Sequence, residues 1–345
     1  MPTPIAIFGA SGYAGGELIR LTDAHPELDV VYLGAHRSAG EPLGVLHPQL
    51  DDGDRILAPL DPAAVVASGA TMAFLALPHG ASAEPALALL DAGVRVVDLG
   101  SDFRLDSAER YQAAYGAEHP HPDQLGRWAY GLPELFWADI ADTDRVAVPG
   151  CYPTATVLAL APLVAGRLIE PEGIVVNALS GVSGAGRGVS AALQFGAVDE
   201  SVKAYKVLEH RHQPEMERAL EAIGDSPAGV LFTPHLVPMQ RGLLSTCYGA
   251  VAPGVSTADI REALHAAYDA ASFVEVIGIP PETRWVVGSN RCLISAVVDE
   301  RSGTLVATSA IDNLLKGAAG QGVQCANIVL GLPPEMGLPT TGWMP

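Results

Sequence analysis

Residues 5–15 read Ile5-Ala6-Ile7-Phe8-Gly9-Ala10-Ser11-Gly12-Tyr13-Ala14-Gly15, and this stretch decides the fold of the chain. Its apolar start predicts a strand, its glycines predict a turn, and residues 17–21 continue as a helix that leads to a second strand over 28–33. Strand, glycine turn, helix and strand within about thirty residues is the context that a dinucleotide-binding turn requires. The spacing is GxxGxxG rather than GxGxxG, so tight packing without a ligand stays an alternative.

Each glycine of this turn has its own expected task. Gly9 makes the tight turn, Gly12 lets the backbone approach a pyrophosphate, and Gly15 allows the helix to pack closely on the strand. An NAD site usually has Asp or Glu at the end of the second strand for the ribose 2′-hydroxyl. This chain has His36-Arg37-Ser38 there. A cation and a hydroxyl suit the 2′-phosphate of NADP, with an ordinary solvated arginine as the alternative.

Further strands are expected over 71–77 and 94–99, the second after an alanine- and leucine-rich helix over 83–92. Continuous apolar strands that alternate with helices indicate a parallel sheet covered on both faces. The loop after the second of these strands contains Arg104 and lies at the edge where open α/β sheets bind ligands. Arg104 is therefore a candidate to hold an anionic group, or else it forms a salt bridge that caps a helix.

A second informative stretch is Pro149-Gly150-Cys151-Tyr152-Pro153-Thr154-Ala155. It follows a short strand over 145–148 and precedes an apolar helix over 156–163, so Cys151 is expected on a strand-to-helix corner. Pro153 suits the first helical turn, where its missing N–H costs nothing. Free backbone N–H groups and the helix dipole at such a corner favour a thiolate, the nucleophilic form of cysteine. The alternative is a small, inert, buried cysteine.

Two later segments offer partners for this cysteine. The glycine-rich loop over 180–188 follows a strand over 173–179 and suits a phosphate or nicotinamide pocket, with a flexible linker as the alternative. The residues His210-Arg211-His212 precede a helix over 215–223. A histidine at a helix start is held toward its neutral form, which suits a proton acceptor. Either His210 or His212 is a candidate to meet Cys151, and a hydrogen-bonded structural histidine is the alternative.

The rest of the pattern predicts a second domain of α+β type. Strands are expected over 230–237, 243–251, 273–277, 292–299 and 304–309, with a helix over 257–271, so neighbouring strands form an antiparallel or mixed sheet. A helix is expected over 314–330, in which Gly317, Gly320 and Gly322 predict close approach of a ligand or another backbone. The expected fold class is α/β, a Rossmann-type doubly wound parallel sheet plus an α+β catalytic domain with a mixed or antiparallel sheet.

Composition limits the classes of protein. The chain has 345 residues, enough for two domains, and its 49% apolar and 17% charged residues indicate a packed globular protein. No membrane span or signal peptide is predicted, so a soluble, cytoplasmic protein is expected. A net charge of −19 repels nucleic acid and anionic membranes. The four cysteines lack close pairing or metal-type spacing, so neither a disulfide framework nor a metal site is expected.

Five blocks in order along the chain carry a resemblance to a known family. They are Gly9 to Gly15, Pro149 to Ala155, Ser180-Gly181-Val182-Ser183-Gly184-Ala185-Gly186-Arg187, His210-Arg211-His212-Gln213-Pro214-Glu215 and Phe232-Thr233-Pro234-His235-Leu236-Val237-Pro238-Met239. With them, the chain from Ile5 to about Leu332 resembles the N-acetyl-γ-glutamyl-phosphate reductases of arginine biosynthesis. The resemblance implies NADPH-dependent reductive dephosphorylation of N-acetyl-L-glutamyl 5-phosphate to the 5-semialdehyde through a cysteine thioester.

The resemblance also implies residue roles, with Cys151 as the nucleophile and His210 as the acid/base. We expect NADP(H) to be bound by Gly9, Ser11, Gly12, Tyr13, Ala14, Gly15, His36, Arg37, Ser38, Ser183, Gly184 and Asn313, and the substrate by Arg104, Ser180 and Tyr205. The NADP-binding domain is expected at 1–149 and 311–345, and the catalytic and dimerisation domain at 150–310. The expected partners are the acyl-phosphate substrate and phosphate, without nucleic acid or membrane, and relatives imply a homotetramer.

Three alternatives stay open. The related aminoadipyl-phosphate reductase of lysine biosynthesis has Gly-Cys-Asn in its cysteine block, whereas this chain has Gly150-Cys151-Tyr152, and the block from Phe232 to Met239 also favours the glutamyl enzyme. A thiol hydrolase built on cysteine and histidine would need no cofactor. A nucleotide sensor would bind NADP without turnover. Phosphate-dependent reduction of NADP⁺ by the semialdehyde separates the last two from a reductase.

Overall fold

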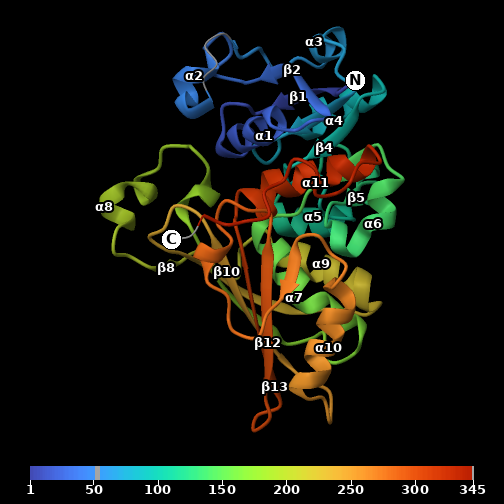
Figure 1. Ribbon diagram of the computed structural model, residues 1–345, viewed down its shortest axis with the longest axis vertical. Coiled ribbons are helices and arrows are strands. Elements are labelled where there is room, and N and C mark those ends of the chain that lie inside the picture. The colour runs from blue at the N-terminus through green and yellow to red at the C-terminus, as the bar shows by residue number, and fades with distance from the viewer. Residues whose placement is uncertain (51–54, 344–345) are drawn as a thin grey trace. The chain divides into compact units, whose positions relative to one another are not determined.

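The computed structural model describes residues 1–50 and 55–343 and divides the chain into two compact units (Figure 1). Unit 1 combines Met1–Ala108, apart from residues 51–54, with Glu118–Pro149 and Ala318–Leu338. Unit 2 combines Glu109–Ala117, Gly150–Gly317 and the described residues after Leu338. The units therefore differ from the expected domain bounds at residues 109–117, 311–317 and the last described residues, which all belong to unit 2.

Unit 1 is built on a six-stranded sheet in the order β2-β1-β3-β4-β6-β5, and every neighbouring pair is parallel. Its strands are β1 (Thr3–Phe8), β2 (Leu28–Gly34), β3 (Met72–Leu75), β4 (Arg95–Asp98), β5 (Ala129–Tyr130) and β6 (Arg145–Ala147). The strand order reverses at β1, because β2 lies on one side of it and β3 on the other. Such a reversal creates the crevice where open α/β sheets bind ligands. The predicted parallel sheet is confirmed, and the two-residue β5 is an addition to it.

The central strands of this sheet are covered on both faces. All four residues of the apolar run Ile5 to Phe8 are fully buried, as in a strand with helices on either side. The helices of unit 1 are α1 (Tyr13–Asp23), α2 (Leu43–Leu46), α3 (Pro62–Ala67), α4 (Ala83–Asp91), α6 (Pro133–Ala141) and α11 (Gly320–Val329), with short 3₁₀ turns at Pro48–Leu50 and Pro122–Gln124. Helix α11 contacts α1, α6 and β4, so the C-terminal helix completes the core of unit 1.

Unit 2 is built on a seven-stranded mixed sheet in the order β11-β12-β13-β10-β7-β9-β8. Its strands are β7 (Ile174–Ser180), β8 (Lys203–Ala204), β9 (Val230–Leu236), β10 (Leu243–Ala250), β11 (Val274–Val276), β12 (Cys292–Asp299) and β13 (Thr304–Ile311). The pairs β7/β9 and β11/β12 are parallel, and the other four are antiparallel. The predicted mixed sheet is confirmed.

Helix α7 (Cys151–Ala165) is the buried centre of unit 2. It contacts the helices α9 (Gln213–Gly224) and α10 (Thr257–Tyr268) and the strands β10 and β13. Pro162 lies inside this helix and has no N–H to donate to the carbonyl of Leu158. The hydroxyl of Tyr268 donates to that carbonyl at 2.7 Å instead. A buried acceptor that proline leaves open is thus satisfied, and the helix continues to Ala165.

The remaining helices of unit 2 are short. They are α5 (Ala108–Tyr115), α8 (Phe195–Val198) and 3₁₀ turns at Val182–Ala185, Ala191–Leu193 and Thr283–Trp285. The helix expected over 314–330 begins with a π-helical turn, Leu315–Ala319, in which the N–H of Gly317 donates to the carbonyl of Asp312 at 2.9 Å. Among the described residues, none of the helices is long and apolar enough to cross a membrane.

Candidate active site

Cys151 is the first residue of α7, and Gly150 caps this helix in an extended conformation. The predicted strand-to-helix corner is therefore present. The Cys151 side chain is partly exposed, whereas Cys247, Cys292 and Cys325 are buried. Of the four cysteines, Cys151 alone combines access for a ligand with the N-terminus of a helix, where a thiolate is stabilised.

Two residues outside the predicted catalytic and binding residues hold this corner in place. The N–H of Gly150 donates to Oε1 of Glu215 at 2.9 Å, and Glu215 is buried in the first turn of α9. The backbone of Gly317 packs directly against the cysteine, since a Cβ at Gly317 would lie 2.7 Å from Cys151 Cβ. The close approach predicted from the helix glycines is thus found at Gly317, and its neighbour is the candidate nucleophile itself.

A cluster of aromatic rings joins the cysteine corner to the histidine segment. Tyr152 lies edge-on to His210, His212 and Phe232, with ring centroids 5.6, 5.9 and 5.1 Å apart. Tyr205 lies 5.6 Å from His210, and its hydroxyl is 3.0 Å from the hydroxyl of Tyr152. The predicted residues Tyr205 and His210 therefore meet beside the residue that follows Cys151. The sequence did not decide whether His210 or His212 meets Cys151, and both histidines belong to the cluster.

Burial keeps Tyr152, Tyr205 and His210 of this cluster uncharged at neutral pH. Burial, and then the nearby charges of Arg211 and Lys206, lower the pKa of His210 to about 4. Burial raises the pKa of Tyr205 to about 12, and it also raises the pKa of Tyr152. Nδ1 of His210 accepts the N–H of His212 at 3.2 Å, so the proton of the neutral ring is on Nε2. At neutral pH, His210 therefore offers an N–H donor.

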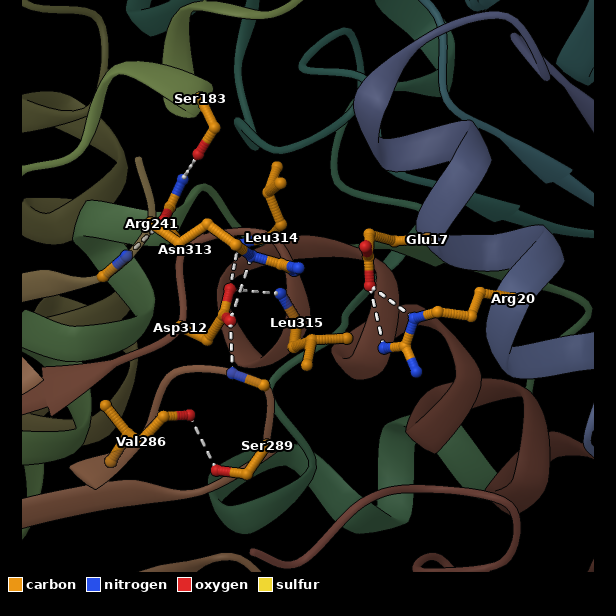
Figure 2. A network of polar contacts seen from close by, with 12 residues as sticks. Glu17, Arg20, Ser183, Arg241, Val286, Ser289, Asp312, Asn313, Leu314 and Leu315 are labelled. Atoms are coloured by element: carbon orange, nitrogen blue, oxygen red, sulfur yellow. Dashed lines mark hydrogen bonds and ion pairs between the residues drawn. The ribbon is translucent and has the colours of Figure 1, made fainter. Parts of the chain in front are cut away.

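Asn313 holds the glycine-rich loop over 180–188. Its Oδ1 accepts the N–H of Gly242 at 2.8 Å, and its Nδ2 donates to Oγ of Ser183 at 3.0 Å (Figure 2). Ser180 is buried and donates to the carbonyl of Gly181 at 3.2 Å, whereas Gly184 is exposed. The structure brings Ser180, Ser183 and Asn313 together, and both ends of the Asn313 amide are engaged by the protein. A contact of Asn313 with the nicotinamide stays a prediction.

The neighbouring Asp312 fixes the start of the π-helical turn. It is fully buried, and its carboxylate accepts the N–H groups of Leu314, Leu315 and Gly288 at 2.8, 3.2 and 2.8 Å (Figure 2). Nε of Arg241 lies 3.2 Å from the same carboxylate. Because Gly317 follows within this turn, Asp312 also fixes the backbone that packs against Cys151. The sequence gave no sign of the contact with Arg241.

The glycine turn of unit 1 has the geometry of a phosphate cradle. Gly9 has φ +85°, and a Cβ there would lie 2.2 Å from the carbonyl oxygen of Ala76; a Cβ at Gly15 would lie 2.2 Å from the oxygen of Gly9. A Cβ at Gly12 would have only one neighbour, at 3.4 Å. Packing therefore requires Gly9 and Gly15, while the space beside Gly12 is open. None of the described residues accepts a hydrogen bond from the N–H of Ser11 or Ala14. A dinucleotide pyrophosphate fits this turn.

The other predicted residues of unit 1 lie at the carboxyl edge of its sheet. His36 and Arg37 are exposed and Ser38 is partly exposed, just after β2, and Tyr13 is exposed at the start of α1. Arg104 is buried, and its Nη2 donates to the carbonyl of Leu99 at 2.8 Å. An anion-binding role for Arg104 stays a prediction. No group of three metal-ligating side chains occurs among residues 1–50 and 55–343.

Two family models match the chain. One, described as the semialdehyde dehydrogenase NAD binding domain, matches residues 4–143, and the other, the semialdehyde dehydrogenase dimerisation domain, matches residues 151–313. The first match confirms a nicotinamide dinucleotide as cofactor. The second begins at Cys151 and ends at Asn313, and it includes His210.

Curated relatives match over the full chain. A protein of Frankia casuarinae named N-acetyl-gamma-glutamyl-phosphate reductase is 46% identical over 100% of both chains. A protein of Thermobifida fusca with the same name is 47% identical over 99% of this chain and 98% of its own. These matches confirm the resemblance drawn from the five sequence blocks.

Solved structures support the fold. Aspartate semialdehyde dehydrogenase II of Vibrio cholerae, complexed with ASA, superposes with a TM-score of 0.71 at 18% identity, over 96% of this chain and 99% of its own. The enzyme of Candida albicans, solved with NADP, superposes with a TM-score of 0.67 at 18% identity, also over 96% and 99%. A parallel sheet joined in one chain to a mixed-sheet unit is thus the architecture of semialdehyde dehydrogenases.

Proposed function

Because the chain belongs to the N-acetyl-gamma-glutamyl-phosphate reductases, a family of semialdehyde dehydrogenases, we propose that it reduces N-acetyl-L-glutamyl 5-phosphate to N-acetyl-L-glutamate 5-semialdehyde with NADPH. This reaction is a step of arginine biosynthesis. The observation that carries the proposal is the partly exposed Cys151 at the N-terminus of α7, beside the rings of Tyr152, Tyr205 and His210. The other parts of the mechanism follow from these residues.

Cys151 carries the acyl group. Its thiolate attacks the acyl carbon of the substrate, a C–S bond forms, and the bond from carbon to the phosphate oxygen breaks, so phosphate leaves with the electron pair and takes a proton from water. The thioester that remains is electrophilic, and thiolate is a good leaving group, which explains cysteine rather than serine at this position. The Glu215 contact with Gly150 and the close packing of Gly317 hold the sulfur at the helix N-terminus.

The glycine turn of unit 1 holds the cofactor. The open N–H groups of Ser11 and Ala14 and the space beside Gly12 suit the pyrophosphate, and His36, Arg37 and Ser38 suit the 2′-phosphate that distinguishes NADP from NAD. When bound, NADPH supplies the hydride that reduces the thioester carbonyl. The turn is completed by Tyr13, Gly9 and Gly15. The nicotinamide is proposed to contact Ser183, Gly184 and Asn313.

His210 acts at the carbonyl oxygen of the bound acyl group. Its pKa of about 4 leaves it neutral, and its Nδ1 already accepts the N–H of His212. The remaining Nε2–H therefore donates a hydrogen bond to the oxygen on which negative charge develops during reduction, and it stabilises the anionic hemithioacetal without giving up its own proton. When the C–S bond of the hemithioacetal breaks, the carbonyl re-forms and the sulfur leaves as thiolate. Arg104, Ser180 and Tyr205 are proposed to hold the substrate.

The reverse reaction tests the proposal. Purified protein is mixed with N-acetylglutamate semialdehyde, NADP⁺ and phosphate, and NADPH is followed by its absorbance. We expect reduction of NADP⁺ that depends on phosphate and disappears in Cys151→Ser. A thiol hydrolase would show no dependence on NADP⁺, and a sensor would bind NADP⁺ without turnover. Substantial reduction by Cys151→Ser would end the thioester mechanism.

The substrate, assembly and location are tested separately. Comparing kcat/KM for glutamyl and aminoadipyl phosphates on the same preparation decides the chain length, and we expect preference for glutamyl because Tyr152 follows the cysteine. We also propose a cytoplasmic homotetramer, in line with a family model over residues 151–313 that is described as a dimerisation domain. Light scattering and cell fractionation test these two points, and a monomer or a membrane-bound protein would contradict them.

A further inference from the structure

His47 has no part in the mechanism above, yet it touches the glycine turn of unit 1. It directly follows helix α2 and is buried, with 2% of its surface exposed. Its Nε2 lies 2.9 Å from the carbonyl oxygen of Ala10. Since a carbonyl only accepts, Nε2 carries the proton. The ring also covers Gly16, because a Cβ there would lie 2.4 Å from Cε1 of His47.

This hydrogen bond sets the direction of one peptide group of the turn. In a trans peptide, the C=O of Ala10 and the N–H of Ser11 lie in one plane and point in opposite directions. Because the Ala10 oxygen is directed to His47, the Ser11 N–H is directed away from it. That N–H has no acceptor among residues 1–50 and 55–343. His47 therefore holds an open donor in the orientation that the turn presents to a ligand.

His47 also links this turn to the segment that follows β2. That segment contains Arg37; the isolated bridge Gly34–Ala58 ties its far end to β2, and the bridge Pro42–Ile56 joins two parts of the segment to each other. The N–H of His47 donates to the carbonyl of Leu43 at 2.9 Å, so the imidazole projects from a folded part of the same segment. One histidine thus connects the turn proposed for the pyrophosphate with the segment proposed for the 2′-phosphate.

We propose that His47 is a positioning residue of the dinucleotide site, which fixes the Ala10–Ser11 peptide so that the Ser11 N–H is ready to donate to a cofactor phosphate. The inference rests on the proposed cofactor. His47 itself does not touch the phosphate. Its removal is expected to weaken cofactor binding and to leave the chemistry at Cys151 unchanged.

The test is a titration of NADPH fluorescence with the full-length protein. His47→Ala is expected to bind NADPH about tenfold more weakly, which corresponds to about 1.4 kcal/mol. The kcat at saturating NADPH and the rate of Cys151 alkylation are expected to stay within about twofold of the wild-type values, because the substitution affects only the binding of NADPH. His47→Gln keeps an N–H donor and is expected to recover most of the affinity.

A double-mutant cycle tests the contact itself. Gly16→Ala pushes the ring of His47 and is expected to weaken NADPH binding in the wild-type background, whereas it is expected to add little to His47→Ala. Independent effects of the two changes would contradict the proposed contact. So would NADPH affinity in His47→Ala within about twofold of the wild-type value, a ratio worth about 0.4 kcal/mol.

His25 supplies a matched control in the same unit. It is also buried, its Nε2 lies 3.0 Å from Oδ1 of Asn327, and its ring covers Gly337, where a Cβ would lie 2.2 Å from Cδ2. It follows the far end of α1, about 16 Å along the helix from the turn. His25→Ala is expected to lower the melting temperature but not the NADPH affinity, and equal losses of affinity would overturn the proposal. If the wild-type protein binds no NADPH, the proposed cofactor is itself wrong and this inference falls with it.

Discussion

Gly317→Ala is the substitution that tests the cysteine corner most sharply. The new methyl carbon would lie 2.7 Å from Cβ and 3.2 Å from Cα of Cys151, and 3.3 Å from Cδ1 of Ile311. Ordinary contacts between such carbon atoms lie at about 3.5–4.0 Å, so one of the two backbones must move by about 1 Å. The turn that bears Gly317 is held by the buried Asp312, and Cys151 begins the buried helix α7. We therefore expect the sulfur to be displaced.

The expected loss follows from that displacement. A shift of about 1 Å at a reacting atom costs about 10²-fold in rate. Overpacking of a filled site costs about 1–3 kcal/mol of stability, so the variant is expected to remain folded at 25 °C. Gly317→Ala is therefore expected to lose about 10²-fold in kcat/KM while its circular dichroism spectrum remains that of the wild type.

The assay combines turnover with chemical labelling. Reduction of NADP⁺ by the semialdehyde measures the reaction, and the rate of iodoacetamide alkylation measures the state of Cys151. Gly322→Ala is the control, because a Cβ there lies 3.3 Å from Cδ1 of Leu99, a side-chain atom that can shift, and alanine favours the helix. Wild-type turnover and alkylation in Gly317→Ala would refute the reasoning.

Three further predictions concern other parts of unit 2. Tyr268→Phe leaves the carbonyl of Leu158 without its donor, and we expect the free energy of unfolding to fall by about 1–3 kcal/mol. Urea titrations measure this change, and an unchanged urea midpoint would contradict it. The pKa of His210 is about 4 in the folded protein, whereas an ordinary histidine has a pKa of 6.5. As pH falls, the unfolded chain therefore binds a proton at this histidine before the folded protein does. The stability that the neutral ring contributes is present above pH 6.5 and is lost as pH falls toward 4. Melting temperatures of His210→Gln are expected to depend less on pH in that window, and an unchanged dependence would argue against a buried neutral ring. Tyr205→Phe removes the hydroxyl that bonds Tyr152, and we expect a higher KM for the acyl phosphate with unchanged NADPH affinity, whereas equal changes in both would contradict a substrate role.

The sequence predicted those parts of the fold that depend on local pattern. Buried parallel strands read as continuous apolar runs, and the run Ile5 to Phe8 is fully buried in β1. The glycine turn and the Gly150-Cys151 corner follow from residues that are adjacent in the chain. Strand β12 was predicted with its observed bounds, Cys292–Asp299. The two-residue strand β5 escaped prediction because it is too short to show a period.

Contacts between distant segments escaped prediction for a different reason. Examples are the contacts of Gly317 with Cys151, of His47 with Ala10 and of Tyr268 with Leu158. In each pair, nothing in the local sequence around one residue identifies the other as its partner. The π-helical turn that contains Gly317 is another example. A glycine in a helical pattern indicates that another group packs closely against it, but it does not indicate which group. The residues offered His210 and His212 as candidates, the resemblance selected His210, and the structure adds the tautomer that makes it a donor.

The central claim is that Cys151 carries the acyl group, and it is tested most directly by trapping the thioester. The protein is incubated with N-acetylglutamate semialdehyde and NADP⁺ in phosphate-free buffer and is then analysed by peptide mass spectrometry. We predict an N-acetylglutamyl group on the peptide that contains Cys151, formed together with a burst of NADPH and released when phosphate is added. A burst of NADPH with the acyl group on another residue, or with none on Cys151, would contradict the account.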